Sequence, residues 1–225
     1  MPRFRRLWRS WWPTLALIAG VLSFRSAVAD WYDVPTGSMQ PTIYVGDRIL
    51  VDKTAYDWRL PLLGAVSHRA DPARGDIVTF ASPADGVRLV KRVIALPGDM
   101  VEMRGNRLLL NGEPLAYADR DAPLIWSLPP DDPAPVDLLT EDLAGVRHTV
   151  MLTPDRPSRS DWGPVRVPEG RYLMLGDNRD NSADSRWFGF VPREAVEGRA
   201  HHVAVSLDHD HGWLPRWGRT LAALE

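Results

Sequence analysis

The chain has 225 residues, of which 44% are hydrophobic and 25% are charged, a balance typical of a folded globular protein. The net charge of −2 provides no strong positive field, so the composition argues against nucleic-acid binding. Cysteine is absent, which excludes disulfides, cysteine nucleophiles and cysteine-ligated zinc. Twenty prolines and 17 glycines favour short strands joined by turns over a mainly helical fold.

Residues 1–29 have the features of a membrane-targeting segment. Four arginines and no acidic residue occur in residues 1–10, and an apolar stretch follows. A helix from Trp11 to Trp31 would be about 30 Å long, the thickness of the hydrocarbon core of a bilayer. This favours a retained transmembrane helix in the inner or plasma membrane, with a cytoplasmic N-terminus and the remaining chain on the outer face. A cleaved signal peptide ending at Ala27-Val28-Ala29 is the alternative.

Residues 30–117 and 171–207 are predicted to form a β core. Alternating or continuous apolar runs bounded by glycine, proline, asparagine and aspartate indicate strands near 45–51, 76–80, 87–96, 106–110, 113–117, 171–175 and 199–207. Asn111-Gly112 predicts a type I′ turn between two of them. We expect residues 57–74 to form a surface loop and residues 192–196 a single helical turn.

The composition changes at about residue 118. Nine prolines and many acidic residues fall within residues 118–170, which predicts a loop-rich insertion on one side of the core. Residues 208–225 are predicted to be a C-terminal tail.

Ser38 is a candidate nucleophile because of the residues around it. Gly37 removes side-chain bulk next to the serine, so a substrate backbone can approach closely. Pro35 and Pro41 stiffen the chain on both sides of Ser38. The apolar Met39 suggests a hydrophobic surface beside the turn. On these features alone, an ordinary turn serine remains the alternative.

The general base is predicted to be a lysine. None of the six histidines lies in a sequence that points to a catalytic triad, and His209-Asp210-His211 lacks a third metal ligand, so no metal site is predicted. Of the two lysines, Lys53 lies in a polar stretch. Lys91 shares one face of a predicted strand with Leu89 and Val93, and burial there would favour the neutral amine. A lysine that protects a strand edge is the alternative.

Four blocks of the sequence together resemble the type I signal peptidases, the serine–lysine leader peptidases of bacteria. In chain order the blocks are 35–42, 74–78, 90–99 and 175–186, the last continuing to Pro192. The resemblance implies a mainly β fold, with an antiparallel β-sheet or coiled β-barrel as catalytic core. It implies an endopeptidase that cleaves signal peptides from exported preproteins after small residues of the Ala-X-Ala type, with no metal or cofactor.

The resemblance also implies residue roles. Ser38 would be the nucleophile, Lys91 the general base, and the oxyanion hole would be the Ser38 N–H with the Thr36 hydroxyl, where the family often has serine. Ser182 would hydrogen-bond the Lys91 amine, and Asp184 with Arg186 would form a structural ion pair. The substrate pockets would be lined by Val34, Met39, Ile43 and Val90.

The expected partners are exported preproteins and the lipid bilayer, without nucleic acid; the sequence predicts no oligomeric state. Two other functions remain open at this point. One is a specialised serine–lysine peptidase that matures a single conjugation or pilus protein. The other is a non-enzymatic membrane-anchored β-domain.

Overall fold

The computed structural model describes residues 11–17, 29–60, 64–119, 135–154, 156–209 and 211–224. Residues 11–17 are helical. None of the helices in these ranges has the length and apolar character needed to cross a bilayer. Most of the predicted anchor, and Ala27 and Val28 of the alternative cleavage site, lie outside the described residues.

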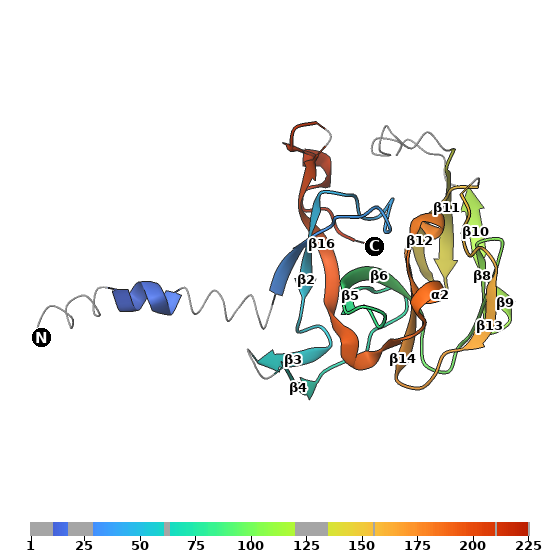
Figure 1. Ribbon diagram of the computed structural model, residues 1–225, viewed down its shortest axis with the longest axis horizontal. Coiled ribbons are helices and arrows are strands. Elements are labelled where there is room, and N and C mark those ends of the chain that lie inside the picture. The colour runs from blue at the N-terminus through green and yellow to red at the C-terminus, as the bar shows by residue number, and fades with distance from the viewer. Residues whose placement is uncertain are drawn as a thin grey trace, which may run out of the picture.

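The largest sheet has eight antiparallel strands. Its order is β1-β2-β16-β5-β6-β14-β15, and β17 pairs with β16. The bounds are β1 (Ala29–Asp33), β2 (Asp47–Asp52), β5 (Ile77–Ala81), β6 (Arg88–Ala95), β14 (Arg171–Leu175), β15 (Val191–Pro192), β16 (Val196–Asp208) and β17 (Leu214–Pro215). The mainly β, antiparallel fold is therefore confirmed, and the long strand β16 runs through the middle of this sheet (Figure 1).

Three smaller sheets complete the described strands. One has the order β13-β7-β8-β9, a second β10-β11-β12, and the third is the hairpin β3-β4. Their bounds are β3 (Asp57–Leu60), β4 (Gly64–His68), β7 (Met100–Arg104), β8 (Arg107–Leu110), β9 (Glu113–Pro114), β10 (Ala116–Asp119), β11 (Asp137–Leu143), β12 (Val146–Leu152) and β13 (Trp162–Arg166). Figure 1 shows β8–β13 gathered on the side of the molecule opposite β1 and β2.

Short helical segments connect the later strands. They are η2 (Arg179–Asn181), α2 (Ser185–Phe188), η3 (Arg193–Ala195) and η4 (Trp217–Arg219). The helical turn expected at 192–196 corresponds to η3. The Asn111-Gly112 turn has positive φ at both residues (55° and 88°), as a type I′ hairpin requires.

Two expectations about loops were wrong. Residues 57–60 and 64–68 pair as the antiparallel strands β3 and β4 rather than forming a plain loop. Within residues 118–170, the described part holds the paired strands β11 and β12, and β13, which pairs with β7. Ala144 and Gly145 have positive φ (52° and 97°) and close the β11-β12 hairpin. The loop-rich interpretation overlooked this hairpin because it weighed the prolines, which lie outside β11 and β12.

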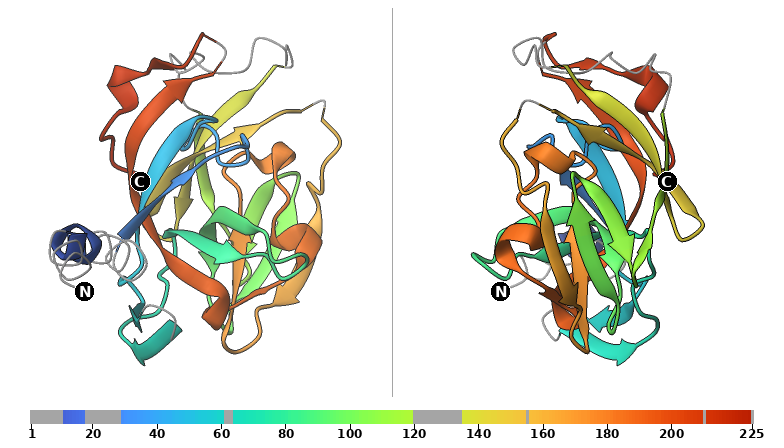
Figure 2. Two further views of the ribbon diagram at one scale, coloured as in Figure 1. Left: turned by 60° about the vertical axis from the view of Figure 1, so that its left-hand side comes forward. Right: turned by 90° about the vertical axis from the view of Figure 1, so that its right-hand side faces the viewer.

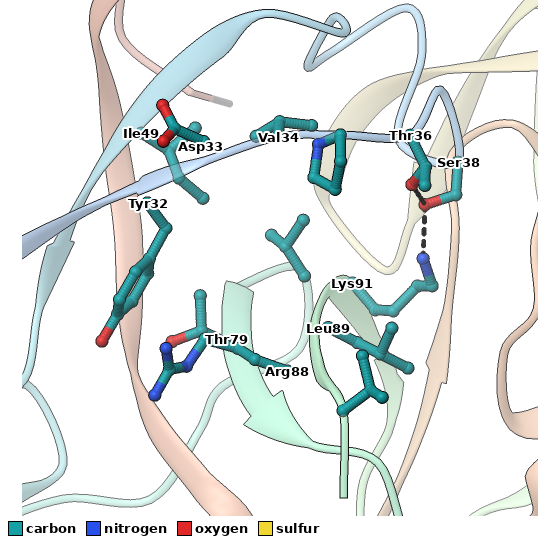
Figure 3. Close-up of a pocket in the computed structure, with 13 residues that line it drawn as sticks. Tyr32, Asp33, Val34, Thr36, Ser38, Ile49, Thr79, Arg88, Leu89 and Lys91 are labelled. Atoms are coloured by element: carbon teal, nitrogen blue, oxygen red, sulfur yellow. Dashed lines mark hydrogen bonds between the residues drawn. The ribbon is translucent and has the colours of Figure 1, made fainter. Parts of the chain in front are cut away.

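The sheet is strongly curled (Figure 2). As a result, residues of β1 and of β6 lie on opposite sides of one cavity (Figure 3). The strand β1 is a sheet edge, paired only with β2 among the described strands. The strand β14 pairs with β6 from Arg92 onward, so among the described strands residues 88–90 of β6 pair only with β5. Two unpaired edges thus border the site described next.

Candidate active site

Ser38 lies in a tight turn soon after β1. The Gln40 N–H donates to the Gly37 carbonyl at 3.1 Å, which places Ser38 at the corner of the turn. Asn178 holds the turn from the opposite side: its backbone N–H donates to the Ser38 carbonyl and its side-chain amide to the Gly37 carbonyl. Within the described part of the chain the Ser38 N–H has no acceptor, so it can bind an incoming oxygen.

Lys91 reaches Ser38 from β6. Its Nζ lies 2.5 Å from the Ser38 Oγ (Figure 3), and its side chain is buried, with 2% of the residue exposed. Burial lowers the pKa of Lys91 from 10.5 to about 8, against the opposing effect of the Asp184 and Asp177 carboxylates. With this pKa about a tenth of the amines are neutral at pH 7 and about half at pH 8. A neutral amine can accept the Ser38 proton.

Thr36 stands beside the serine, as Figure 3 shows. Its hydroxyl lies 3.5 Å from the Ser38 Oγ and has no shorter hydrogen bond among the described residues. The Thr36 hydroxyl, held only by this long hydrogen bond, and the Ser38 N–H are thus two donors beside the Ser38 hydroxyl.

Asp184 and Arg186 form the expected ion pair. Arg186 donates through Nε and Nη2 to the two carboxylate oxygens, both at 2.8 Å, and both side chains are buried. Asp184 also accepts from the Gly176 N–H, and Arg186 donates to the Arg179 carbonyl. The pair therefore fixes the loop after β14 from both of its ends.

The predicted hydrogen bond between Ser182 and the Lys91 amine is wrong. The Ser182 hydroxyl is buried and has no hydrogen-bond partner among the described residues, so the expected bond to the Lys91 amine is not formed. A Cβ at Gly176 would lie 2.3 Å from both the Ser182 Oγ and the Ser38 carbonyl. Ser182 and Ser38 therefore contact the same glycine and lie at most a few ångströms apart. The Lys91 amine instead bonds to Ser38, which is closer to the end of its side chain.

The sequence analysis did not find two buried ion pairs near Ser38 and Lys91. Arg92 binds Asp177 through Nε and Nη2 at 2.9 and 2.8 Å, and Asp177 also accepts from the Thr42 hydroxyl at 2.5 Å. Arg179 similarly pairs with Glu141, at 2.7 Å. An arginine inside the apolar run of β6 was the available signal, because a buried guanidinium requires a carboxylate partner.

A cavity of about 290 Å³ runs from Ser38 and Lys91 to Tyr32 and Arg88 (Figure 3). Val34 and Val90 line it, as expected of pocket residues. Other lining residues were not assigned to a pocket from the sequence: Pro35, Ile49, Thr79, Val87 and Leu89. Met39 and Ile43 do not line it. Both are fully buried in the hydrophobic cluster that contains Val34 and Ile49, because their turn folds them inward.

The other chemistry-bearing candidates lie elsewhere. Lys53 forms an ion pair with Asp30 at 3.1 Å. The His209 ring stacks on Trp213, with ring centroids 3.9 Å apart. No three or more His, Asp or Glu side chains in the described ranges converge as metal ligands.

Comparison with known proteins gives consistent matches along the chain. The family described as signal peptidase, peptidase S26, matches residues 7–205. Signal peptidase I of Pseudomonas fluorescens is 37% identical over 211 residues, which cover 88% of this chain and 71% of that protein. Signal peptidase I of Pseudomonas aeruginosa is 36% identical over 232 residues, covering 94% and 76%. Signal peptidase I of Leptolyngbya laminosa is 35% identical over 187 residues, covering 80% and 70%.

Proposed function

The chain belongs to the signal peptidase family, peptidase S26, and on that premise we propose that it removes signal peptides from exported preproteins with Ser38 as nucleophile and Lys91 as general base. The observation that carries the proposal is the 2.5 Å distance between the Lys91 Nζ and the Ser38 Oγ. A buried lysine with a lowered pKa beside a serine is the arrangement that activates a hydroxyl without histidine.

In the proposed reaction the neutral Lys91 amine takes the Ser38 proton while the Ser38 Oγ attacks the carbonyl carbon of the scissile bond. The tetrahedral intermediate collapses, the C–N bond breaks, and the proton passes from Lys91 to the amine of the departing mature chain. The signal peptide remains as an ester on Ser38. Lys91 then deprotonates a water molecule, which hydrolyses the ester and restores the serine.

The Ser38 N–H and the Thr36 hydroxyl are the proposed oxyanion hole. The absence of an acceptor for that N–H among the described residues supports this role. Each such donor stabilises the developing negative charge by a few kcal/mol. Asp184 with Arg186 is proposed to act by holding the loop that contacts Ser38, without touching the substrate.

The unpaired edges of β1 and of residues 88–90 in β6 suggest how the substrate binds. An extended peptide can hydrogen-bond to such edges while alternate side chains enter a cavity. Val34, Ile49 and Val90 give the cavity apolar walls. We therefore propose that it accepts small side chains, in agreement with cleavage after Ala-X-Ala sequences.

The proposed location is a membrane surface. We propose that residues 1–29 form a single anchor with a cytoplasmic N-terminus and that the catalytic part lies on the outer face, close to the lipid bilayer that holds its substrates. We propose that residues 30–117 and 171–207 are the catalytic core, residues 118–170 an insertion and residues 208–225 the tail.

The test is cleavage of purified preproteins by the full chain, its Ser38→Ala variant and a control, Ser67→Ala, in which an exposed serine on β4 is changed. We expect Ser38→Ala to lose cleavage and Ser67→Ala to retain it. Retained cleavage in Ser38→Ala would contradict the proposal. Depletion of the protein in cells should leave many exported precursors uncut; accumulation of one precursor alone would indicate a specialised maturation peptidase.

A further inference from the structure

Ser38 belongs to a loop whose two ends are joined. The Val34 N–H donates to the Asp47 carbonyl and the Gly46 N–H donates to the Val34 carbonyl, both at 3.0 Å. Residues 34–47, which we call the nucleophile loop, therefore form a closed excursion between β1 and β2. A side chain on a loop is placed less precisely than one on a strand, so the position of the Ser38 hydroxyl depends on the groups that hold this loop.

The loop after β14 provides one set of these groups. Asn178 donates to the carbonyls of Ser38 and Gly37, and the Asp177 carboxylate accepts from the Thr42 hydroxyl at 2.5 Å. These contacts hold the nucleophile loop at the serine itself and at a position four residues after it.

Arg219, in the C-terminal part of the chain, provides a second set. Its Nη2 donates to the Thr42 carbonyl at 3.0 Å and to the Asp47 carboxylate at 2.7 Å. Its guanidinium carbon lies 3.7 Å from the centroid of the Tyr44 ring. Asp47 is fully buried and also accepts from the Tyr44 N–H, so its charge fixes the arginine against the loop. Figure 1 shows the last part of the chain beside the segment that follows β1.

The residues around Arg219 are themselves attached to the largest sheet. The strand β17 pairs with the end of β16, and the Arg216 N–H donates to the Ser206 carbonyl at 2.8 Å. After Arg219, the Leu221 N–H donates to the Val203 carbonyl, also at 2.8 Å. Arg219 is therefore held on both sides by β16, and it presents its guanidinium to the nucleophile loop from a fixed support.

Thr42 is the residue at which the two sets of contacts meet. Its carbonyl accepts from Arg219 and its hydroxyl donates to Asp177. Asp177 in turn pairs with Arg92, the neighbour of Lys91 on β6. A continuous series of polar contacts thus joins the C-terminal residues, the loop that carries the nucleophile and the strand that carries the base.

We infer that Arg219 is a positioning residue for the peptidase reaction, which holds the nucleophile loop so that the Ser38 hydroxyl meets the Lys91 amine. The inference rests on the proposed function, because it assigns Arg219 a part in the activation of Ser38. The family match ends at residue 205, so the inference extends the catalytic unit beyond that match.

The contacts of Arg219 predict which kinetic constant its loss changes. Among the described residues its guanidinium hydrogen-bonds only to the nucleophile loop, through Thr42 and Asp47. Neither residue lines the cavity proposed to bind the signal peptide. Removal of the guanidinium should therefore lower kcat and leave KM nearly unchanged.

The test compares Arg219→Gln and Arg219→Lys in the full chain with a matched control, Arg193→Gln. Arg193 also pairs with a buried aspartate, Asp57, at 2.9 Å, and donates to backbone carbonyls. The two arginine side chains are similarly exposed, 17% for Arg193 and 21% for Arg219. Arg193 binds the chain next to β3 and β4, away from the nucleophile loop.

Both glutamine variants should have a lower midpoint temperature of thermal unfolding, since each leaves a buried carboxylate without its cation. Activity is then measured at a temperature at which every variant is folded. We expect Arg219→Gln to lower kcat about 10- to 100-fold with KM within about twofold of wild type, and Arg193→Gln to keep the wild-type kcat. Arg219→Lys keeps a cation beside Asp47, so it should fold even if Arg219→Gln does not, and its kcat should be about three- to tenfold below wild type.

Hydrogen exchange of the backbone amides reports the loop without relying on cleavage. Exchange in peptides from residues 34–47 should be faster in Arg219→Gln and unchanged in Arg193→Gln. Wild-type kcat in either Arg219 variant would overturn the inference. An equal loss of kcat in Arg193→Gln, or a loss in Arg219→Gln without faster exchange in the loop, would overturn it as well. Should wild type cleave no preprotein, the proposed function is wrong, and exchange alone then decides whether Arg219 holds the loop.

Discussion

Asp177 and Arg92 form a buried ion pair with two hydrogen bonds, which joins the strand carrying Lys91 to the loop after β14. Arg92 is the neighbour of Lys91 on β6, and Asp177 also accepts from the Thr42 hydroxyl. The next residue, Asn178, binds the Ser38 carbonyl. Nucleophile and base thus depend on one carboxylate for their relative position.

We expect Asp177→Asn to destabilise the fold by about 3–5 kcal/mol, since it leaves the Arg92 guanidinium buried without a counter-charge. The midpoint temperature of thermal unfolding and the kcat/KM of cleavage should both decrease. Asp142→Asn is the matched control: Asp142 pairs with the exposed Arg147 at 3.5 Å, and its loss should change neither quantity measurably. Equal behaviour of the two variants would show that the buried pair does not hold the site together.

The pH dependence of cleavage should report the Lys91 amine. Because its pKa is lowered to about 8, kcat/KM should rise about tenfold per pH unit below that value and level off above it. Measurement between about pH 6 and pH 10 checks this expectation. Lys53→Met should keep the profile, whereas Lys91→Arg should be inactive throughout because a guanidinium stays protonated. A profile that is flat across this range would be incompatible with lysine as the base.

Lys91→Met should be inactive yet more stable than wild type at neutral pH. The folded-state pKa of Lys91 lies below its unfolded value of 10.5, so between about pH 8 and 10.5 the unfolded chain binds more protons and wild-type stability rises with pH. Below about pH 8 the full cost of burying the charge is present, up to about 3 kcal/mol. Denaturant unfolding at pH 7 should show this gain, which should shrink toward pH 10. If Lys91→Met is less stable than wild type at pH 7, burial of the protonated Lys91 amine does not destabilise the fold.

Thr36→Val should lower kcat by about 10²- to 10³-fold with little change in KM, since a donor to the oxyanion acts in the transition state. Thr36→Ser keeps the hydroxyl and should remain within a few fold of wild type. Steady-state kinetics on one peptide substrate distinguishes the two variants. If valine is tolerated as well as serine, the Ser38 N–H alone serves the oxyanion.

The sequence patterns were informative where local chemistry decides the structure. Asn111-Gly112 specified its hairpin, because positive φ at two successive positions is required there. The apolar run around Lys91 specified β6. The hairpins β3-β4 and β11-β12 were missed, since their strands are short or carry exposed and charged residues, and their pairing partners decide the outcome.

The positions of Ser38, Lys91 and Thr36 could be predicted, but their surroundings could not. Pairing Asp177 with Arg92 and Glu141 with Arg179 requires knowing which segments lie side by side across long stretches of chain. Met39 and Ile43 were assigned to the substrate pocket. An apolar residue near a nucleophile can lie either in the core or in a pocket, and the sequence alone does not distinguish the two. Only the fold of the turn shows which of the two applies.

The curled sheet has a consequence for inactivation by heat. Ser38 follows β1 and Lys91 lies on β6, with β2, β16 and β5 between them in the sheet. In the described part of the chain β1 pairs with β2 alone. A small outward movement of β1 would therefore separate the hydroxyl from the amine while most of the β structure persists. Proteolytic activity should therefore disappear at a lower temperature than the far-ultraviolet circular dichroism signal. Loss of activity on heating would then report the detachment of β1 from β2.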